Sequence, residues 1–274
     1  EGGDVLTLMA RELFVDDEYI ASDNRHYRIS AVDKEKRTAT AIHIGEVELP
    51  HIEEVREEAK GLSYRDSLEA VSIPEDGHVL LYCTHNAESY VPGDGAPSIE
   101  GHGGILDIAE SFRKNLESHG VKAYLDKTPH EPHDAGAYRR SRNTAVQLIK
   151  SKRPVAAIFD IHRDATPREE YELQLGGKPA SKVRIVLGKR NQNMRVNQEL
   201  AYKIKAVADK TYPGLIKDIY IGNGMYNQEL SPRSLLFEMG THEIDKGAVV
   251  TSTVYLADVV SKRLFGGKLK SIEN

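Results

Sequence analysis

The spacing of apolar positions changes near residue 70. Beyond it, short apolar runs alternate with segments of helical spacing. The predicted strands are Val79–Cys83, Val121–Leu125, Val155–Ile161, Lys182–Leu187, Ile216–Ile221 and Ser234–Glu238. The predicted helices are Ile105–His119, Ala137–Ser151, Val196–Thr211 and Ala248–Phe265. This alternation is typical of an α/β fold, so we expect a mostly parallel sheet with helices on both faces.

The first part of the chain has a different pattern. Val5–Phe14 has helical apolar spacing, and Glu53–Lys60 is a charged segment that predicts a helical connector. Tyr27–Val32 and Thr38–Ile44 alternate like strands around the polar turn Asp33–Lys36, which is a hairpin signal. These features predict a small N-terminal α+β appendage.

We therefore expect an appendage over residues 1–65 and a catalytic domain over residues 66–274. No candidate ligand or base lies in the appendage, which predicts that it is dispensable for catalysis. The net charge is −5 and no sustained basic tract occurs, so nucleic acid is not expected as the main partner. The apolar runs are too short to span a bilayer. The chain begins at Glu1, so we expect a fragment or a processed form that a signal or anchor segment could have preceded.

Three predicted strands end in residues that can carry chemistry. His85 follows the first apolar strand, His162 follows Val155–Ile161, and Glu238 closes the last strand. Open parallel sheets bind ligands beyond the carboxyl ends of their strands, so these side chains are expected to meet. Two histidines and a carboxylate indicate a metal hydrolase.

The first histidine begins the segment His85-Asn86-Ala87-Glu88. A His-x-x-Glu spacing brings an imidazole and a carboxylate within reach of one ion. Two histidines and a glutamate form a known catalytic zinc set with one coordination position left open. The alternative is a histidine that caps a strand end beside a solvated glutamate.

The second histidine lies in Asp160-Ile161-His162-Arg163-Asp164. Residues two apart in a strand share a face, so Asp160 could hold the His162 ring in one tautomer. The alternative is a buried salt-bridge cluster of Asp160, Arg163 and Asp164.

A carboxylate at the end of a buried strand is costly unless it has a metal, a partner or water, and this singles out Glu238. Glu229 and Glu243 are nearby rivals, but neither ends an apolar strand. His130 and His133 form a second possible metal cluster in a proline-containing loop, which we rank below His85 and His162.

Several motifs occur together in a fixed order. They are Thr84-His85-Asn86-Ala87-Glu88-Ser89-Tyr90, Tyr138-Arg139-Arg140-Ser141-Arg142, Asp160-Ile161-His162-Arg163-Asp164-Ala165, Tyr212-Pro213-Gly214-Leu215, Tyr226-Asn227-Gln228-Glu229-Leu230-Ser231-Pro232 and Leu236-Phe237-Glu238-Met239-Gly240. Together they strongly resemble the stage II sporulation protein P family over about residues 70–265. That family degrades peptidoglycan during engulfment in spore-forming bacteria.

The resemblance extends to zinc N-acetylmuramoyl-L-alanine amidases, whose sheet is sandwiched by helices. It implies that His85 and His162 bind Zn²⁺ and that Glu238 is the catalytic acid and base. In the wider amidases, the third ligand is a glutamate about a dozen residues after the first histidine. Glu100 lies nearer that spacing, whereas Glu88 lies in the motif that matches the family. We choose Glu88 as the third ligand and keep Glu100 as the alternative.

The resemblance also implies a substrate, a partner and a location. The substrate would be peptidoglycan and the partner stage II sporulation protein D, with the catalytic part outside the cytoplasm on a membrane tether that precedes this chain. Cleavage of peptide crosslinks would accompany the amidase activity. A zinc carboxypeptidase or endopeptidase is the alternative, with Arg142 or Arg163 binding a free carboxylate. A non-catalytic peptidoglycan-binding module is the alternative from another class.

Overall fold

The computed structural model describes residues 4–50, 73–74, 76–134 and 136–266. Its strands are β1 (Glu18–Ile20), β2 (Arg25–Asp33), β3 (Thr38–Glu46), β4 (His78–Tyr82), β5 (Ala123–Leu125), β6 (Val155–Asp164), β7 (Glu172–Leu175), β8 (Lys178–Ser181), β9 (Val183–Gly188), β10 (Ile216–Gly222) and β11 (Ser234–Thr241). Its helices are α2 (Val91–Asp94), α3 (Ile105–Ser118), α4 (Ala137–Ser151), the short 3₁₀ helix η1 (Arg168–Glu170), α5 (Met194–Thr211) and α6 (Lys246–Phe265). The predicted strands and helices beyond residue 70 are confirmed, with bounds that shift by a few residues.

Nine strands form one sheet in the order β3-β2-β1-β10-β9-β11-β6-β4-β5. The neighbours β11, β6, β4 and β5 are parallel, as are β10 and β9. β9 runs antiparallel to β11, and β1, β2 and β3 are joined to the sheet by antiparallel pairings. The α/β fold is confirmed, but the prediction of a mostly parallel sheet holds only beyond residue 70. The complete sheet is mixed.

Helices cover both faces of this sheet. The main core lies under α3, α5 and α6, where Phe112, Ile204 and Leu256 are fully buried. α4 covers the opposite face, where Leu148 packs with Leu80 of β4. Asp245 caps the start of α6, because its side chain accepts hydrogen bonds from the backbone N–H groups of Gly247 and Ala248. No helix in the described ranges is both long enough and apolar enough to cross a membrane.

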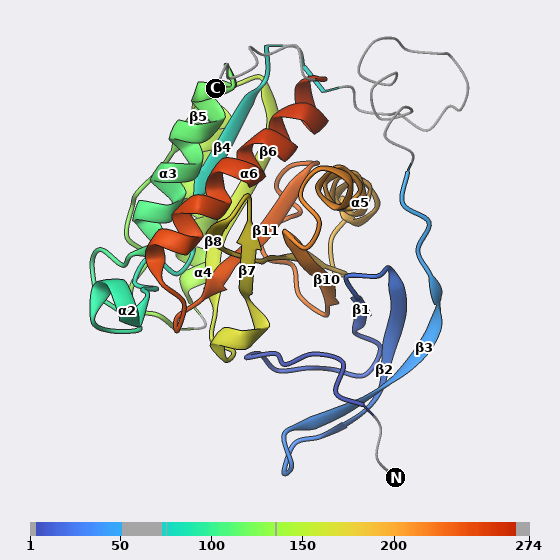
Figure 1. Cartoon of the computed structure of the whole chain (residues 1–274). Helices are drawn as coiled ribbons and strands as arrows, with labels where there is room; N and C mark the ends of the chain where they lie inside the picture. Colours follow the sequence, from blue (N-terminus) through green and yellow to red (C-terminus); the bar gives the residue numbers. More distant parts are fainter. Residues whose placement is uncertain (1–3, 51–72, 75, 135, 267–274) are drawn as a thin grey trace.

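The N-terminal part continues the main sheet. β1 pairs with β10, and the predicted hairpin of β2 and β3 extends from it (Figure 1). The predicted helix over Val5–Phe14 is wrong, because residues 4–15 contain no helix. Met9 and Leu13 instead pack on the sheet face, against Val186, Tyr220 and Leu236. The predicted helix Glu53–Lys60 and the boundary near residue 65 lie outside the described residues, so the division into two units stays a prediction.

Candidate active site

Three neighbouring strands bring the predicted residues to one edge of the sheet. Glu238 of β11 is in register with His162 of β6, and β4 lies on the other side of β6 and leads into His85. Alternation along β6 places Asp160 and His162 on the face that α4 covers. The structure therefore brings the two histidines and the glutamate to the same edge of the sheet, while their chemical roles stay a prediction.

His162 lies between two carboxylates. Its Nδ1 is 3.7 Å from Oε1 of Glu88, and its Nε2 is 3.0 Å from Oδ1 of Asp160 without the angles of a hydrogen bond. Thr84 fixes Asp160 through its backbone N–H (2.8 Å) and its hydroxyl (2.6 Å). Burial would lower the pKa of His162, but the two carboxylates raise it well above its usual value. The two carboxylates thus stabilise a positive charge here, either a proton on the ring or a cation bound to its nitrogen.

His85 faces His162 from the loop after β4. The two rings meet edge to face with centroids 5.1 Å apart, and His133 stacks on His85 at 3.8 Å. Burial, followed by the nearby His162, lowers the pKa of His85 to about 4. Its Nδ1 is buried and has no hydrogen-bond partner in the described part of the chain. His85 is therefore a neutral imidazole with an unpaired nitrogen, which is the form that binds metals.

The loop that carries Glu88 is fixed at both the side chain and the backbone. The Arg163 N–H donates to Oε2 of Glu88 (2.9 Å), and the Ile105 N–H donates to its carbonyl oxygen (3.0 Å). Gly103 lies directly against this loop, and a Cβ there would lie 2.2 Å from the Glu88 carbonyl oxygen. Burial would raise the pKa of Glu88, but His162 and other nearby positive groups lower it to about 2. Glu88 is thus an ionised carboxylate in a fixed place.

These donors fit a zinc ion, although the site is not closed around one. No group of three His, Cys, Asp or Glu side chains in the described ranges is already arranged to hold a metal. Donor atoms around tetrahedral zinc lie about 3.3–3.4 Å apart, given bonds of about 2.0–2.1 Å. The 3.7 Å between His162 Nδ1 and Glu88 Oε1 is near that spacing. Asp160 at the opposite nitrogen provides the carboxylate that commonly braces a zinc-bound histidine.

Glu238 has an unexpected partner from the start of the chain. Arg11 forms an ion pair with its Oε1, whereas its Oε2 is buried and has no hydrogen-bond partner among the described residues. Burial raises the pKa of Glu238 and the Arg11 guanidinium opposes this rise. The N-terminal region therefore contributes a side chain that contacts Glu238, although no ligand or base was expected there.

The structure separates Glu88 from its alternative. Glu100 is exposed in the loop before α3, whereas Glu88 is buried beside His162. Arg163 donates from its guanidinium to the carbonyl oxygens of Ser89 (3.3 Å) and Pro97 (2.8 Å), which assigns it a bracing role on the Glu88 loop.

The rival residues have partners of their own. Arg142 pairs with Glu229, and Glu243 accepts a hydrogen bond from the Arg168 N–H (3.1 Å). The buried ring of His130 bonds the Cys83 carbonyl oxygen (2.8 Å) and the Thr144 hydroxyl (2.9 Å). These two hydrogen bonds give His130 a structural role.

Two tyrosines of the site were not singled out from the sequence. The Tyr138 ring, at the start of α4, lies parallel to His162 with centroids 6.3 Å apart. Tyr226, which has a φ of 51°, lies 5.8 Å from Tyr138. Both tyrosines lie in the motifs quoted above, so the sequence could have identified them as candidate site residues. Arg11 lies in no motif and had no such signal.

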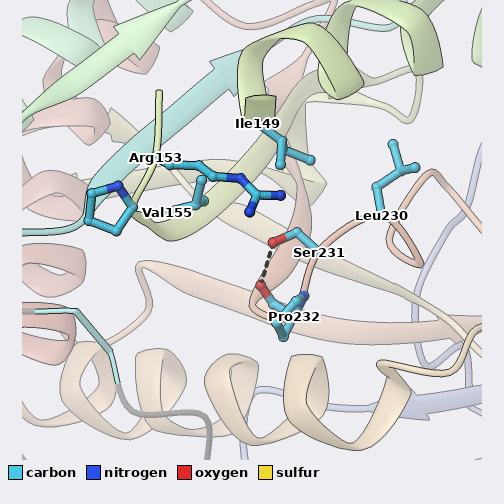
Figure 2. Close-up of a pocket in the computed structure, with 7 residues that line it drawn as sticks. Ile149, Arg153, Val155, Leu230, Ser231 and Pro232 are labelled. Atoms are coloured by element: carbon cyan, nitrogen blue, oxygen red, sulfur yellow. Dashed lines mark hydrogen bonds between the residues drawn. The ribbon is translucent and has the colours of Figure 1, made fainter. Parts of the chain in front are cut away.

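A surface pocket of about 380 Å³ lies elsewhere in the molecule. Figure 2 shows it between the amino end of β6 at Val155, the end of α4 at Ile149 and the Leu230–Pro232 loop. Ser231 donates to the Pro232 carbonyl oxygen there (3.1 Å). His162 and Glu238 lie toward the other ends of their strands, so this pocket is separate from the candidate active site.

Several solved amidase structures are similar to this chain. The N-acetylmuramoyl-L-alanine amidase AmiC2 of Nostoc punctiforme is 15% identical, with a TM-score of 0.42 over 70% of this chain and 96% of its own. The CwlD amidase from Clostridioides difficile, in complex with the GerS lipoprotein, is 13% identical, with a TM-score of 0.44 over the same shares. The CwlV amidase of Paenibacillus polymyxa is 14% identical, with a TM-score of 0.43 over 69% of this chain and 98% of its own. Similarity at this level does not establish a shared activity.

Sequence comparison gives the family. Stage II sporulation protein P of Bacillus subtilis (strain 168) is 30% identical over an alignment of 201 residues that covers 67% of this chain and 50% of that protein. The match thus spans about half the length of this relative. The model of the stage II sporulation protein P family matches residues 9–261, which include Arg11 as well as the quoted motifs. The chain therefore belongs to the stage II sporulation protein P family.

Proposed function

We propose that this chain is a zinc-dependent peptidoglycan hydrolase. It acts as an N-acetylmuramoyl-L-alanine amidase and cleaves the bond between the glycan lactyl group and the stem peptide during engulfment in sporulation. The observation that supports this most is the convergence of His85, Glu88 and His162 beside Glu238. Membership of the sporulation family agrees with it.

His85, Glu88 and His162 would hold the zinc, which when bound polarises the scissile carbonyl and lowers the pKa of water. The free oxygen of Glu238 accepts a proton from the water that attacks the carbonyl carbon. Glu238 then gives this proton to the amide nitrogen as the C–N bond breaks. The products are the glycan lactyl acid and a stem peptide with a free amine. Asp160 keeps the His162 ring oriented throughout.

The wider setting is part of the same proposal. The catalytic part acts outside the cytoplasm on a membrane tether, and stage II sporulation protein D is its partner on peptidoglycan. Cleavage within peptide crosslinks is a second activity of the same site. A carboxypeptidase would need a cation free to bind a terminal carboxylate, and the pairing of Arg142 with Glu229 speaks against that role for Arg142.

Mass spectrometry of fragments released from purified peptidoglycan tests this function. We expect the wild-type protein with zinc to release stem peptides with free amino termini and glycan with free lactyl groups. Glu238→Gln should release almost none, whereas Glu169→Gln, the same change at an exposed position, should match the wild type. Release of shortened peptides alone would identify a peptidase instead. Binding without any release would indicate a non-catalytic module.

A further inference from the structure

We propose that Arg11 is a positioning residue of the active site, which holds one oxygen of Glu238 so that the other faces the reacting water. This inference rests on the proposed function and assigns the N-terminal segment a part in it. The two oxygens of the Glu238 carboxylate have different surroundings. Oε1 is bound by Arg11, and Oε2 is buried without a hydrogen-bond partner among the described residues. A base needs one free oxygen with a fixed direction, and this arrangement provides it.

Arg11 is itself held in place. Its guanidinium carbon lies over the Tyr220 ring, 5.1 Å from the ring centroid, which is a favourable cation–π contact. The Arg11 side chain is 20% exposed and the Glu238 side chain 5% exposed. Removing one partner of an ion pair this shielded from water costs much more stability than removing one partner of a surface ion pair. Arg11 can therefore orient the carboxylate as well as neutralise it.

The segment on either side of Arg11 is anchored to the sheet. Before it, Lys217 donates to the Thr7 hydroxyl (2.7 Å) and Arg184 donates to the Leu8 carbonyl oxygen (3.3 Å). After it, Asp17 accepts hydrogen bonds from the Phe14 N–H (2.9 Å) and the Tyr220 hydroxyl (2.6 Å). The chain then enters β1, which pairs with β10.

These contacts indicate whether the segment around Arg11 is a permanent part of the site or a removable cover. Met9 and Leu13 pack on the sheet on either side of Arg11, so lifting the segment would expose apolar surface. It would also break hydrogen bonds with Arg184, which is fully buried. A segment held this firmly belongs to the working site.

Kinetics of Arg11 variants provide the first test. With a soluble muropeptide as substrate, Arg11→Ala should lower kcat on the order of a hundredfold, the scale for misplacing a reacting group, with KM nearly unchanged. Arg11→Lys keeps a charge but not the planar fork, so it should recover part of the rate. Zinc content should stay near wild type, whereas the melting temperature should fall because Glu238 loses its buried partner, so kcat is measured well below that temperature. Arg28→Ala, the same change at an exposed position of β2, is the control and should have wild-type kcat.

A second readout needs neither zinc nor turnover. The zinc-free wild type and Arg11→Ala are treated with a carbodiimide and an amine, and coupling to each carboxyl is measured by peptide mass spectrometry. Loss of Arg11 should raise coupling at Glu238 several-fold and leave Glu88 unchanged, because only Glu238 loses its partner. Arg28→Ala should leave both unchanged.

The outcomes separate this inference from the proposed function. Normal or increased kcat in Arg11→Ala would overturn the positioning role, and an increase would identify the segment as an inhibitory strap. Unchanged coupling at Glu238 would also overturn it. A wild type that cleaves no bond would refute the proposed function, and the coupling measurement would then decide alone whether Arg11 positions Glu238.

Discussion

Asp160 and His162 lie two residues apart on β6 and point to the same face, so that Oδ1 of the carboxylate is 3.0 Å from Nε2 of the imidazole. This arrangement leaves Nδ1 toward Glu88. One strand thus supplies both a candidate ligand and its brace. The pattern Asp-x-His in an apolar strand predicts that the two side chains share a face, and the bracing role of Asp160 stays a prediction.

We expect Asp160→Asn to weaken zinc binding by about 10–100-fold, the usual effect of removing a partner behind a ligand. The amide keeps the shape of the side chain but loses the charge that stabilises the His162 ring. Zinc affinity is measured by competition with a chelator. The melting temperature is recorded in parallel, because Asp160 also accepts two hydrogen bonds from Thr84. Wild-type affinity would contradict the bracing role.

His85→Ala and His162→Ala should each lose most of their zinc, because each removes one of the proposed ligands. Elemental analysis after dialysis against a weak chelator gives the occupancy. His102→Ala, which changes an exposed histidine, serves as the control and should keep its zinc. Full occupancy in both site variants would show that the metal is bound elsewhere or not at all.

Glu238→Gln should retain zinc and lose at least about a hundredfold in rate, the scale expected for loss of a general acid and base. The neutral amide cannot take a proton from water, although it can still form hydrogen bonds. Zinc content and kcat are measured on the same preparation. If zinc is lost, Glu238 is a ligand. If turnover stays near normal, the base is another residue.

The buried cation Arg184 should be important for stability. It is fully buried and donates to Asp164 (2.7 Å) and to Asp218 (2.6 Å and 3.0 Å). Arg184→Met should lower the free energy of unfolding by about 3–5 kcal/mol, because it leaves buried carboxylates without a cation. Urea denaturation measures this change, with Arg28→Met as the exposed control. An equal effect of both changes would contradict a special role for Arg184.

The same network predicts how stability depends on pH. Burial would raise the pKa of Asp218, but Arg184 and Lys217 hold it below its usual value. A carboxyl with a lowered pKa in the folded state adds stability above its unfolded-state pKa, about 3.9, and this stability is lost as pH falls further. Urea denaturation from pH 6 to pH 3 should therefore show a steeper fall for the wild type than for Asp218→Asn. Parallel curves would refute this contribution.

The sequence predicted elements well wherever one local pattern decided the structure. Ile105–Ser118 and Ala137–Ser151 are helices because their apolar residues repeat at helical spacing over four turns. Val5–Phe14 has similar spacing over fewer residues, but its backbone is held by distant side chains such as Arg184. The short hairpin of β7 and β8 was missed because its apolar signal is weak.

The direction of β9 could not be predicted either. Its apolar run fits a parallel or an antiparallel strand equally well, and only the assembled sheet shows that it opposes β11. For the same reason, no sequence pattern indicated that Arg11 lies at the site. The ion pair joins residues 227 positions apart, and no periodicity relates such distant positions. Local patterns therefore predicted the candidate ligands but not the partner of Glu238.

That separation along the chain has a consequence for how activity would be gained and lost. His85, Glu88 and His162 all lie in the first two thirds of the chain, whereas the pair of Arg11 and Glu238 forms only when the N-terminal segment meets one of the last strands. A partly folded chain could hold a metal and still lack an oriented base. On the proposed function, damage to Arg11 or Glu238 would slow cleavage while the three proposed ligands still hold the metal. Metal content alone would then be a poor measure of how much of a preparation is active.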